Sequence, residues 1–332
     1  MAPSAWPPTP AWPTRVEPER TRGSVVFLGT SEFAAAVLAR LAASATHRPA
    51  LVVTRPDRPR GRGRKLASPP VALRARALEL PLEQPARIND PAARALLDGK
   101  RQTVVVCAFG ALIKEPLLSE HELLNVHPSL LPRWRGAAPV ERALIAGEAD
   151  TGVSIMRLTA GLDSGPVCLA RSEPITPQDT YGTLAPRLQE LAGELLLAVL
   201  DRKAEGRPLP FLEQDDAVAT YADKILPEDR LLDPSLPVAE LERRVRALHP
   251  HIGARVALRD GTLLRVHAAA VAPAGEQERH AAPGREHGVR ASGERLLFDC
   301  SDGVLDLLVV QPPGGRAMDA AAYLRGHRAA GG

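Results

Sequence analysis

The amino-acid sequence predicts an α/β protein with a doubly wound, mostly parallel sheet in its N-terminal part and a small β-barrel in its C-terminal part. In the N-terminal part, short runs rich in Val and Leu alternate with longer stretches of helical periodicity. This alternation is typical of parallel strands joined by helices. The expected strands are 24–29, 50–54, 103–107 and 122–127, and the expected helices are 32–43, 70–79, 90–98 and 139–147.

The pattern of expected helices and strands changes near residue 223, and this change divides the chain into two parts. Before it, a strand pair is expected at 151–157 and 166–172, and a long amphipathic helix over 180–203. The Gly- and Pro-bearing run from Glu205 to Pro210 then breaks the helical pattern. The predicted parts are a disordered tail over 1–22, a sheet domain over 23–206, a linker over 207–222 and a second domain over 223–332.

The second domain has the pattern of a small barrel. A helix is expected over 238–248, and turns such as Asp260-Gly261 and Asp302-Gly303 separate the short apolar runs that follow it. Several short strands at this spacing suggest a small barrel. The polar, Gly- and Pro-bearing segment 273–288 is expected to be a mobile loop. The expected strands are 254–258, 263–267, 295–299 and 304–310.

Composition indicates a soluble, cytoplasmic protein. The 332 residues are 45% hydrophobic, without any run approaching the roughly 18 apolar residues of a membrane span. The three cysteines are far apart and in apolar surroundings, which predicts reduced core residues and neither a disulfide frame nor a metal site. A net charge of +3 is too small to indicate nucleic-acid binding by itself. Residues 1–22 carry six prolines and no apolar segment of a secretory signal.

Asn125 and His127 are the first candidate functional residues. They lie two apart at the end of the expected strand 122–127, so their side chains share one face. Pro128 ends the strand, which places the pair at the rim of the sheet where open α/β sheets bind ligands. Taken alone, polar groups at a strand end are more often local hydrogen-bonding groups than catalysts.

Asp163 is a candidate third member of this site. It lies between Gly161 and Gly165, where a turn can return a carboxylate to the imidazole. A single Asp in such a turn usually serves the turn itself.

The run 55–65 contains six cations and one acid, Asp57, with Gly61 and Gly63 among them. Charge alone favours a solvated, flexible loop, although phosphate binding also needs mobile cations. A second motif is weaker. Gly29 follows the first expected strand without the other two glycines of a dinucleotide-binding pattern, so NAD binding is rejected in favour of a turn glycine.

The run Asn125-Val126-His127-Pro128-Ser129-Leu130-Leu131-Pro132 resembles the signature of the 10-formyltetrahydrofolate-dependent formyltransferases. Its continuation, Arg133-Trp134-Arg135-Gly136-Ala137-Ala138-Pro139, is similar to the branch of that family that acts on methionyl-tRNA. The likeness covers nearly everything after about residue 23, in the expected order. It includes residues 25–30, 54–59, 61–66, 161–165 and 311–312.

This resemblance implies transfer of a formyl group from 10-formyltetrahydrofolate to the α-amino group of methionine on initiator tRNA. Asn125 and a cationic His127 would stabilise the tetrahedral oxyanion, and Asp163 would orient His127 and serve proton transfer. No metal is required. The second domain would be OB-like. Initiator methionyl-tRNA and the folate are the implied partners, without a membrane or an obligate protein partner.

The resemblance also implies two binding regions. A folate pocket would be formed by Phe109, Gly110, Ser129, Leu130, Leu131 and Pro132. The tRNA would be contacted by Arg58, Arg60, Arg62, Arg64 and Lys65. Two departures from the family pattern affect pocket details: Phe109 replaces a frequent Tyr, and Ser31-Glu32 a frequent Pro-Asp.

The second domain lacks an overall positive charge. Residues 223–332 contain 15 basic and 15 acidic side chains. Phosphate contact there would depend on clusters such as Arg243, Arg244 and Arg246. Two alternatives stay open: a relative of the same fold that formylates a small amine, such as glycinamide ribonucleotide or an amino sugar, and a non-catalytic RNA-binding module.

Overall fold

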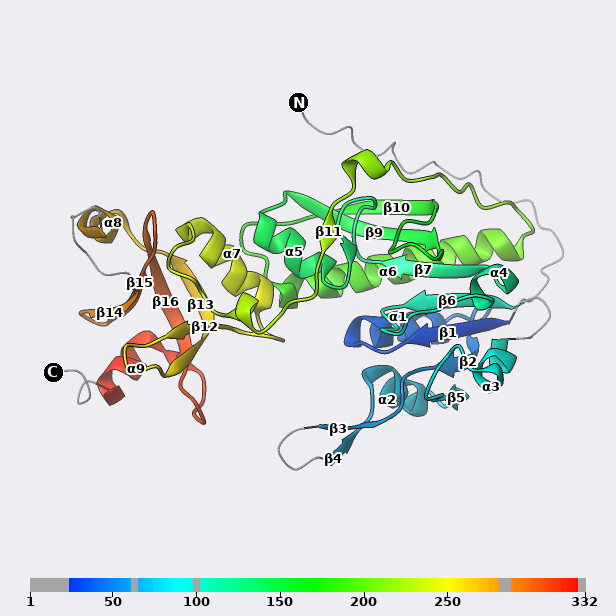
Figure 1. The fold of residues 1–332 in the computed structure, drawn as a ribbon, viewed down its shortest axis with the longest axis horizontal. Helices are drawn as coiled ribbons and strands as arrows, with labels where there is room; N and C mark the ends of the chain where they lie inside the picture. The colour runs from blue at the N-terminus through cyan, green and yellow to red at the C-terminus, as the bar shows by residue number, and fades with distance from the viewer. Residues whose placement is uncertain (1–23, 61–64, 98–101, 281–287, 328–332) are drawn as a thin grey trace. The chain divides into compact units, whose positions relative to one another are not determined.

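The computed structural model describes residues 24–60, 65–97, 102–280 and 288–327, which form two compact units (Figure 1). The predicted tail lies outside the described residues. The first unit runs to Gly136 and also contains Asp150–Pro174 and Ala185–Tyr221; the second contains Ala137–Ala149, Ile175–Leu184 and the chain from Ala222. The expected linker, 207–222, thus lies almost wholly in the first unit. The domain limits drawn from the sequence stay predictions.

A seven-stranded sheet forms the centre of the first unit, in the order β10-β9-β7-β6-β1-β2-β5. The strands from β7 to β5 are parallel, whereas β9 and β10 run antiparallel beside β7. The doubly wound, mostly parallel sheet expected from the sequence is confirmed. Its strands are β1 (Val25–Gly29), β2 (Pro49–Val53), β5 (Leu82–Glu83), β6 (Thr103–Cys107), β7 (Leu123–His127), β9 (Asp150–Arg157) and β10 (Val167–Pro174).

Apolar side chains fill both faces of the central strands. Val26 and Leu28 of β1 lie in one cluster with Val104 and Val106 of β6, while α1 packs on β1 and β6. Burial on both faces explains why these strands are continuous apolar runs without polar alternation. The helices are α1 (Glu32–Ala42), α2 (Pro70–Ala77), α3 (Pro91–Arg94) with a 3-10 turn (Ala95–Leu97), α4 (Leu117–Glu120) and α6 (Tyr181–Ala204).

Gly29 ends β1 at a crowded point. A Cβ atom there would lie 2.7 Å from the Phe27 ring and 3.0 Å from the Cys107 carbonyl oxygen. The Thr30 hydroxyl, next in the chain, donates to the Phe109 carbonyl at 2.7 Å and ties the end of β1 to the chain after β6. Close packing between strands therefore accounts for this glycine.

The second unit contains an antiparallel sheet in the order β12-β13-β16-β15-β14, with β17 beside β16. The sheet curls, because its edge strands β12 and β14 contact each other. Helices α7 and α9 pack against it, and α5 packs on α7. The barrel-like second part expected from the sequence is thus confirmed as a curled antiparallel sheet. The elements are α5 (Pro139–Ala146), α7 (Val238–Leu248), β12 (Ala254–Ala257), β13 (Leu263–Val271), β14 (Gly288–Ser292), β15 (Arg295–Asp299), β16 (Val304–Gln311), β17 (Met318–Asp319) and α9 (Ala320–His327).

The segment 273–288, expected to be a mobile loop, begins with a helix, α8 (Ala274–His280). That expectation was wrong for the helix, and residues 281–287 lie outside the described residues. Glu276 accepts hydrogen bonds from Arg290 and Ser292, and the Gln277 side-chain amide donates to the Ala272 and Val304 carbonyls. Polar contacts, and not an apolar stripe, hold this helix. Its sequence therefore lacks the pattern by which a helix is usually recognised.

The three cysteines are free and buried. Burial raises the pKa of the Cys107 thiol far above its ordinary value, and that of Cys168 and Cys300 to about 12. They therefore pack as small apolar groups. Over the described ranges, no helix is long and apolar enough to cross a membrane.

Candidate active site

Asn125 and His127 lie at the carboxyl end of β7, in the interior of the sheet. β7 pairs with β6 on one side and with β9 on the other, where Asn125 faces Met156 and His127 faces Ser154. Both side chains are buried, at 7% and 4% exposure. Because they are two apart on a strand, they project from the same face. The strand thus brings a carboxamide and an imidazole to one point.

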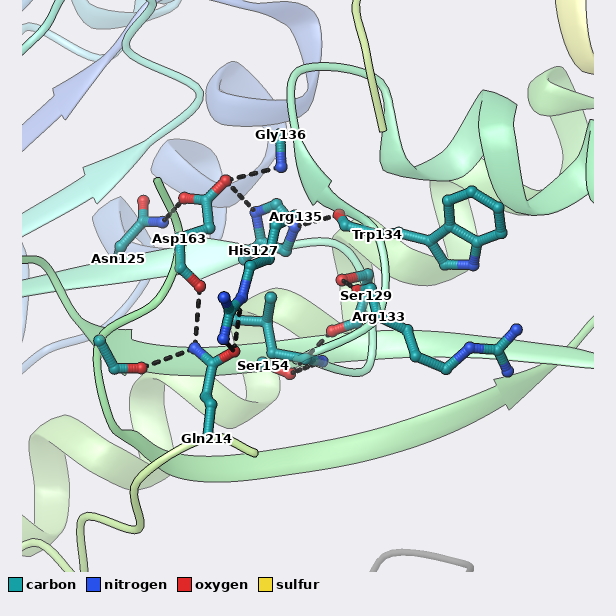
Figure 2. A network of polar contacts seen from close by, with 12 residues as sticks. Asn125, His127, Ser129, Arg133, Trp134, Arg135, Gly136, Ser154, Asp163 and Gln214 are labelled. Atoms are coloured by element: carbon teal, nitrogen blue, oxygen red, sulfur yellow. Dashed lines mark hydrogen bonds and ion pairs between the residues drawn. The ribbon is translucent and has the colours of Figure 1, made fainter. Parts of the chain in front are cut away.

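Asp163 lies between these two side chains (Figure 2). One carboxylate oxygen accepts from Asn125 Nδ2 at 3.4 Å. The other accepts from the backbone N–H of Gly136 at 2.9 Å and lies 3.6 Å from His127 Nδ1. The Asp163 backbone has φ of 46°, a left-handed conformation that Asp tolerates in turns. The three side chains singled out in the sequence therefore form one polar cluster.

Both ring nitrogens of His127 face oxygen acceptors. Nε2 lies 2.9 Å from the Trp134 carbonyl oxygen, which can only accept, so Nε2 carries a proton. Nδ1 faces the Asp163 carboxylate. The ring is therefore held between a backbone carbonyl on one side and a carboxylate on the other.

One donor of Asn125 and one donor of His127 are already paired within the protein. The sequence led us to expect Asn125 and His127 to point at a bound oxyanion, but the Asn125 amide donates to Asp163 and His127 Nε2 donates to Trp134. An amide nitrogen has two hydrogens, and Asp163 takes one of them. The second hydrogen of Asn125 and a change of partner at His127 are what this arrangement can offer a ligand.

The loop after β7 is tied to β9 by serine hydroxyls. The Ser154 hydroxyl donates to the Ser129 carbonyl at 2.7 Å and accepts from the Leu131 N–H at 3.1 Å. Ser129 in turn donates to the Arg133 carbonyl at 2.7 Å. The indole of Trp134 points away from the polar cluster (Figure 2). These bonds fix the loop that carries the Trp134 carbonyl and the Gly136 N–H.

Three of the residues expected to bind folate turn their side chains inward. Ser129 and Leu131 are 0% exposed, and Phe109 is 4% exposed. Leu131 packs with Met156, and Phe109 belongs to the cluster that covers β1 and β6. Leu130 and Pro132 are partly exposed and Gly110 is exposed, so these positions stay predictions.

Two further residues bind the cluster from segments that sequence reasoning did not single out for this role. The Gln214 side chain contacts the Asp163 turn and the Arg135 guanidinium. The Thr220 hydroxyl accepts from the Trp134 N–H at 2.9 Å. Both lie in the segment interpreted as a linker, and no local pattern distinguishes them from other polar residues there.

The basic run forms a β-hairpin at its two ends. β3 (Arg58–Arg60) pairs antiparallel with β4 (Lys65–Ala67), with Arg60 opposite Lys65. Arg58 is exposed. Among the residues expected to bind tRNA, Arg62 and Arg64 lie outside the described residues. The expected flexible loop is thus a hairpin at least at its base.

The hairpin base is held by Asp57, the one acid of the run. Its carboxylate accepts from Ser68 and from Gln84, each at 2.8 Å, and lies 3.7 Å from Arg76. The hydrogen bonds from Gln84 and Ser68 lower the pKa of Asp57 below its ordinary value. Asp57 therefore anchors the hairpin and does not neutralise its cations.

The three arginines of α7, suggested as a cluster for phosphate contact, are paired within the protein. Arg243 donates to the Ile145 carbonyl, Arg244 pairs with Glu240, and Arg246 pairs with Glu242. These charges are taken up by contacts within the second unit. Phosphate contact by this helix stays a prediction.

Comparison with known families places the chain in a class of enzymes. Residues 23–200 match the family described as formyl transferase, and residues 224–328 match the formyl transferase C-terminal domain. The chain belongs to the formyl transferase family.

Within that family, its relatives are the methionyl-tRNA formyltransferases. Proteins of that name from Halorhodospira halophila and Methylococcus capsulatus are 41% and 42% identical, over 92% of this chain and 96% and 98% of theirs. Solved structures share the fold. HypX from Aquifex aeolicus, in complex with tetrahydrofolic acid, has a TM-score of 0.60 at 16% identity, covering 94% of this chain and 48% of that one. An N-formyltransferase from Helicobacter canadensis, with folinic acid and dTDP-3-aminofucose, has a TM-score of 0.62 at 13% identity, covering 86% and 98%.

Proposed function

We propose that this protein transfers the formyl group of 10-formyltetrahydrofolate to the α-amino group of methionine on initiator tRNA. The observation that carries the proposal is the convergence of Asn125, His127 and Asp163 at the end of β7. Relatives about 40% identical over nearly the whole chain are named methionyl-tRNA formyltransferase.

The proposed reaction is an acyl transfer through a tetrahedral intermediate. The methionine amine attacks the formyl carbon, and the carbonyl oxygen becomes an oxyanion. The new carbon–nitrogen bond forms, the bond to N10 of the folate breaks, and the proton lost by the amine is balanced by one gained at N10. The enzyme must therefore supply donors to the oxyanion and a route for one proton.

Asn125 and His127 are the proposed oxyanion donors. The second amide hydrogen of Asn125 is one donor, and His127 Nε2 is the other once it leaves the Trp134 carbonyl. A single donor to a developing oxyanion can be worth roughly 3 kcal/mol in a buried site. The low exposure of both side chains favours such a contribution, because a desolvated donor is stronger than one in water.

Asp163 is the proposed proton acceptor and the group that orients His127. Its side chain is 14% exposed, so the carboxylate has a route to solvent that the imidazole, at 5%, scarcely has. The Gly136 N–H keeps one of its oxygens in place. Asp163 can therefore take the amine proton, directly or through a water molecule, while it faces the His127 ring.

We assign the folate to the rim beside this cluster. Gly110 follows β6, and Leu130 and Pro132 follow β7, so the loops after two neighbouring parallel strands meet there, as in other open α/β sheets. The inward side chains of Phe109, Ser129 and Leu131 would leave backbone groups to contact the pterin.

We assign the tRNA contact to the hairpin β3–β4, through Arg58, Arg60, Arg62, Arg64 and Lys65. Pairing of β3 with β4 places Arg60 opposite Lys65 along the backbone. Cations that neutralise phosphates release counterions, so this contact should be salt-dependent.

The test is a transfer assay with purified protein and 10-formyltetrahydrofolate. Methionyl-tRNA should be formylated, and glycinamide ribonucleotide and an amino sugar nucleotide should not. Formylation of a small amine alone would replace this function with the small-amine alternative. Absence of transfer to every acceptor would favour the RNA-binding alternative.

A further inference from the structure

Within the segment 207–221, the Gln214 side chain makes the contacts with the turn that carries Asp163. The Gln214 amide nitrogen donates to the Asp163 carbonyl at 2.8 Å and to the Gly165 carbonyl at 2.7 Å. Its two hydrogens are thereby assigned to two carbonyls of the same turn. Figure 2 shows this amide directly below the Asp163 backbone. Gln214 thus holds the turn from which the Asp163 carboxylate projects.

The backbone of that turn is tightly packed at the two glycines that flank Asp163. A Cβ at Gly161 would lie 2.2 Å from the Ser164 hydroxyl, and one at Gly165 would lie 2.0 Å from the Arg157 carbonyl oxygen. Asp163 between them has the left-handed φ of 46°. Such a conformation persists where the surroundings determine it. The two bonds from Gln214 are surroundings of this kind.

The oxygen of the same Gln214 amide reaches the opposite side of the carboxylate through Arg135. Its oxygen accepts from Arg135 Nε at 3.0 Å and from Arg135 Nη2 at 2.8 Å. Arg135 directly precedes Gly136, whose N–H donates to the Asp163 carboxylate. Gln214, Asp163, Gly136 and Arg135 therefore form a closed ring of contacts around one carboxylate.

Arg135 depends on this contact. Its side chain is 4% exposed, and its only carboxylate partner among the described residues, Asp216, lies 2.7 Å away and is 80% exposed. Both acceptors, Gln214 and Asp216, lie in the same segment. A buried guanidinium needs such acceptors, since an unpaired buried charge is costly.

We propose that Gln214 is a positioning residue for the transfer reaction, which sets the Asp163 carboxylate against His127 through the Asp163 turn and through Arg135. This inference rests on the proposed function. A displacement of roughly 1 Å at a reacting group can lower a rate by about a hundredfold. Gln214 does not touch the reacting atoms in this arrangement, so we expect a smaller loss, of about tenfold in kcat.

The amide nitrogen and the amide oxygen of Gln214 can be tested separately. Gln214→Met keeps the length and removes every hydrogen bond. Gln214→Glu keeps an acceptor for Arg135 but loses both donors to the Asp163 turn. Because the proposal assigns the positioning chiefly to the turn, both variants should lose about tenfold in kcat, with the KM values for tRNA and folate within about twofold. Glu213→Ala, at the exposed neighbouring position, is the matched control and should equal the wild type.

A double-mutant cycle with Asp163→Asn separates positioning from a general structural role. If Gln214 acts through Asp163, Gln214→Met should lower kcat about tenfold in the wild type and less than about twofold in Asp163→Asn. Folate binding and thermal unfolding monitor the fold, and Gln214→Glu supplies the same cycle if the Met variant does not fold. An equal loss in both backgrounds, or wild-type turnover of Gln214→Glu, overturns the proposal. Wild-type turnover of Asp163→Asn would instead reject the site assignment of the proposed function.

Discussion

The polar cluster of Asn125, His127 and Asp163 and the hairpin β3–β4 are both proposed to act on one substrate, yet the fold treats them differently. In the cluster, Asn125 and His127 are buried, Asp163 is partly buried, and all three contact one another or backbone groups. In the hairpin, Arg58 is exposed and has no ion pair within the described residues. On the proposed roles, chemistry would depend on groups held in place by other parts of the protein, whereas recognition would depend on charges exposed to a partner.

The largest expected effect comes from removing members of the polar cluster. Asn125→Ala, His127→Ala or Asp163→Ala should each lower kcat by roughly a hundredfold or more, because each removes an oxyanion donor or the group that orients one. Binding of tRNA should change little, since the cluster is buried. Steady-state kinetics with methionyl-tRNA and 10-formyltetrahydrofolate measures this.

A second buried histidine provides the matched control for His127. His47 is 5% exposed and pairs with Asp201 at 2.9 Å, also within the first unit. His47→Ala should lower thermal stability and leave kcat near that of the wild type. Equal losses of kcat in His47→Ala and His127→Ala would mean that burial, and not chemistry, explains the effect.

Removal of the hairpin charges should act on binding and leave the chemical step intact. Replacing Arg58, Arg60, Arg62 and Arg64 with Ala should raise the KM for methionyl-tRNA by about tenfold. The salt slope of its kcat/KM should flatten by roughly one unit for each phosphate that the variant no longer neutralises. Folate affinity should stay unchanged. Identical salt series for this variant and the wild type would remove the hairpin from the tRNA interface.

Arg244 and Arg246 of α7 provide a comparison with the arginines of the hairpin, because they are the same residue type but are paired with acids on the same helix. Arg244→Gln removes the pair with Glu240, four residues away on the helix, and should cost about 0.3–0.5 kcal/mol of stability. The KM for methionyl-tRNA and its salt slope should not change. A fall in the salt slope comparable with that of a single hairpin variant would show that this helix contacts phosphate after all.

The smallest expected effect concerns the pH dependence of the hairpin base. The hydrogen bonds from Gln84 and Ser68 lower the pKa of folded Asp57 below 3.8. The stabilisation of the folded hairpin base by the Asp57 carboxylate is therefore complete above pH 3.8. It is lost as the pH falls through the lower pKa of folded Asp57. Nuclear magnetic resonance of the Gln84 side-chain amide should show a titration below pH 3.8, absent in Asp57→Asn. A titration above that pH would contradict the anchoring role.

Much of the first unit could be predicted because its strands are buried on both faces. Runs such as Val104 to Val106 have one interpretation once helical stretches flank them, and the spacing of Asn125 and His127 places them on one face. Asn125 and His127 lie in one contiguous motif and Asp163 in a second, Gly-flanked one, so all three could be singled out from the sequence. Their roles in catalysis stay predictions.

The parts that sequence reasoning missed are held by polar contacts between distant residues. Gln214 lies 51 residues from Asp163 and 79 from Arg135, in a polar segment that resembles any linker. Helix α8 likewise depends on Glu276 and Gln277 contacts with strands, without an apolar stripe. The pairing of Arg244 with Glu240, by contrast, follows from the i,i+4 spacing of the helix expected over 238–248.

The most direct test of this division is formylation of methionyl-tRNA at increasing tRNA concentration, with the wild type, the four-residue hairpin variant and His127→Ala compared at saturating 10-formyltetrahydrofolate. Saturating tRNA should restore the hairpin variant to nearly the wild-type rate. His127→Ala should stay roughly a hundredfold slower at every concentration. A hairpin variant that remains slow at saturation, or a His127→Ala variant that recovers, would contradict the separation of chemistry from recognition.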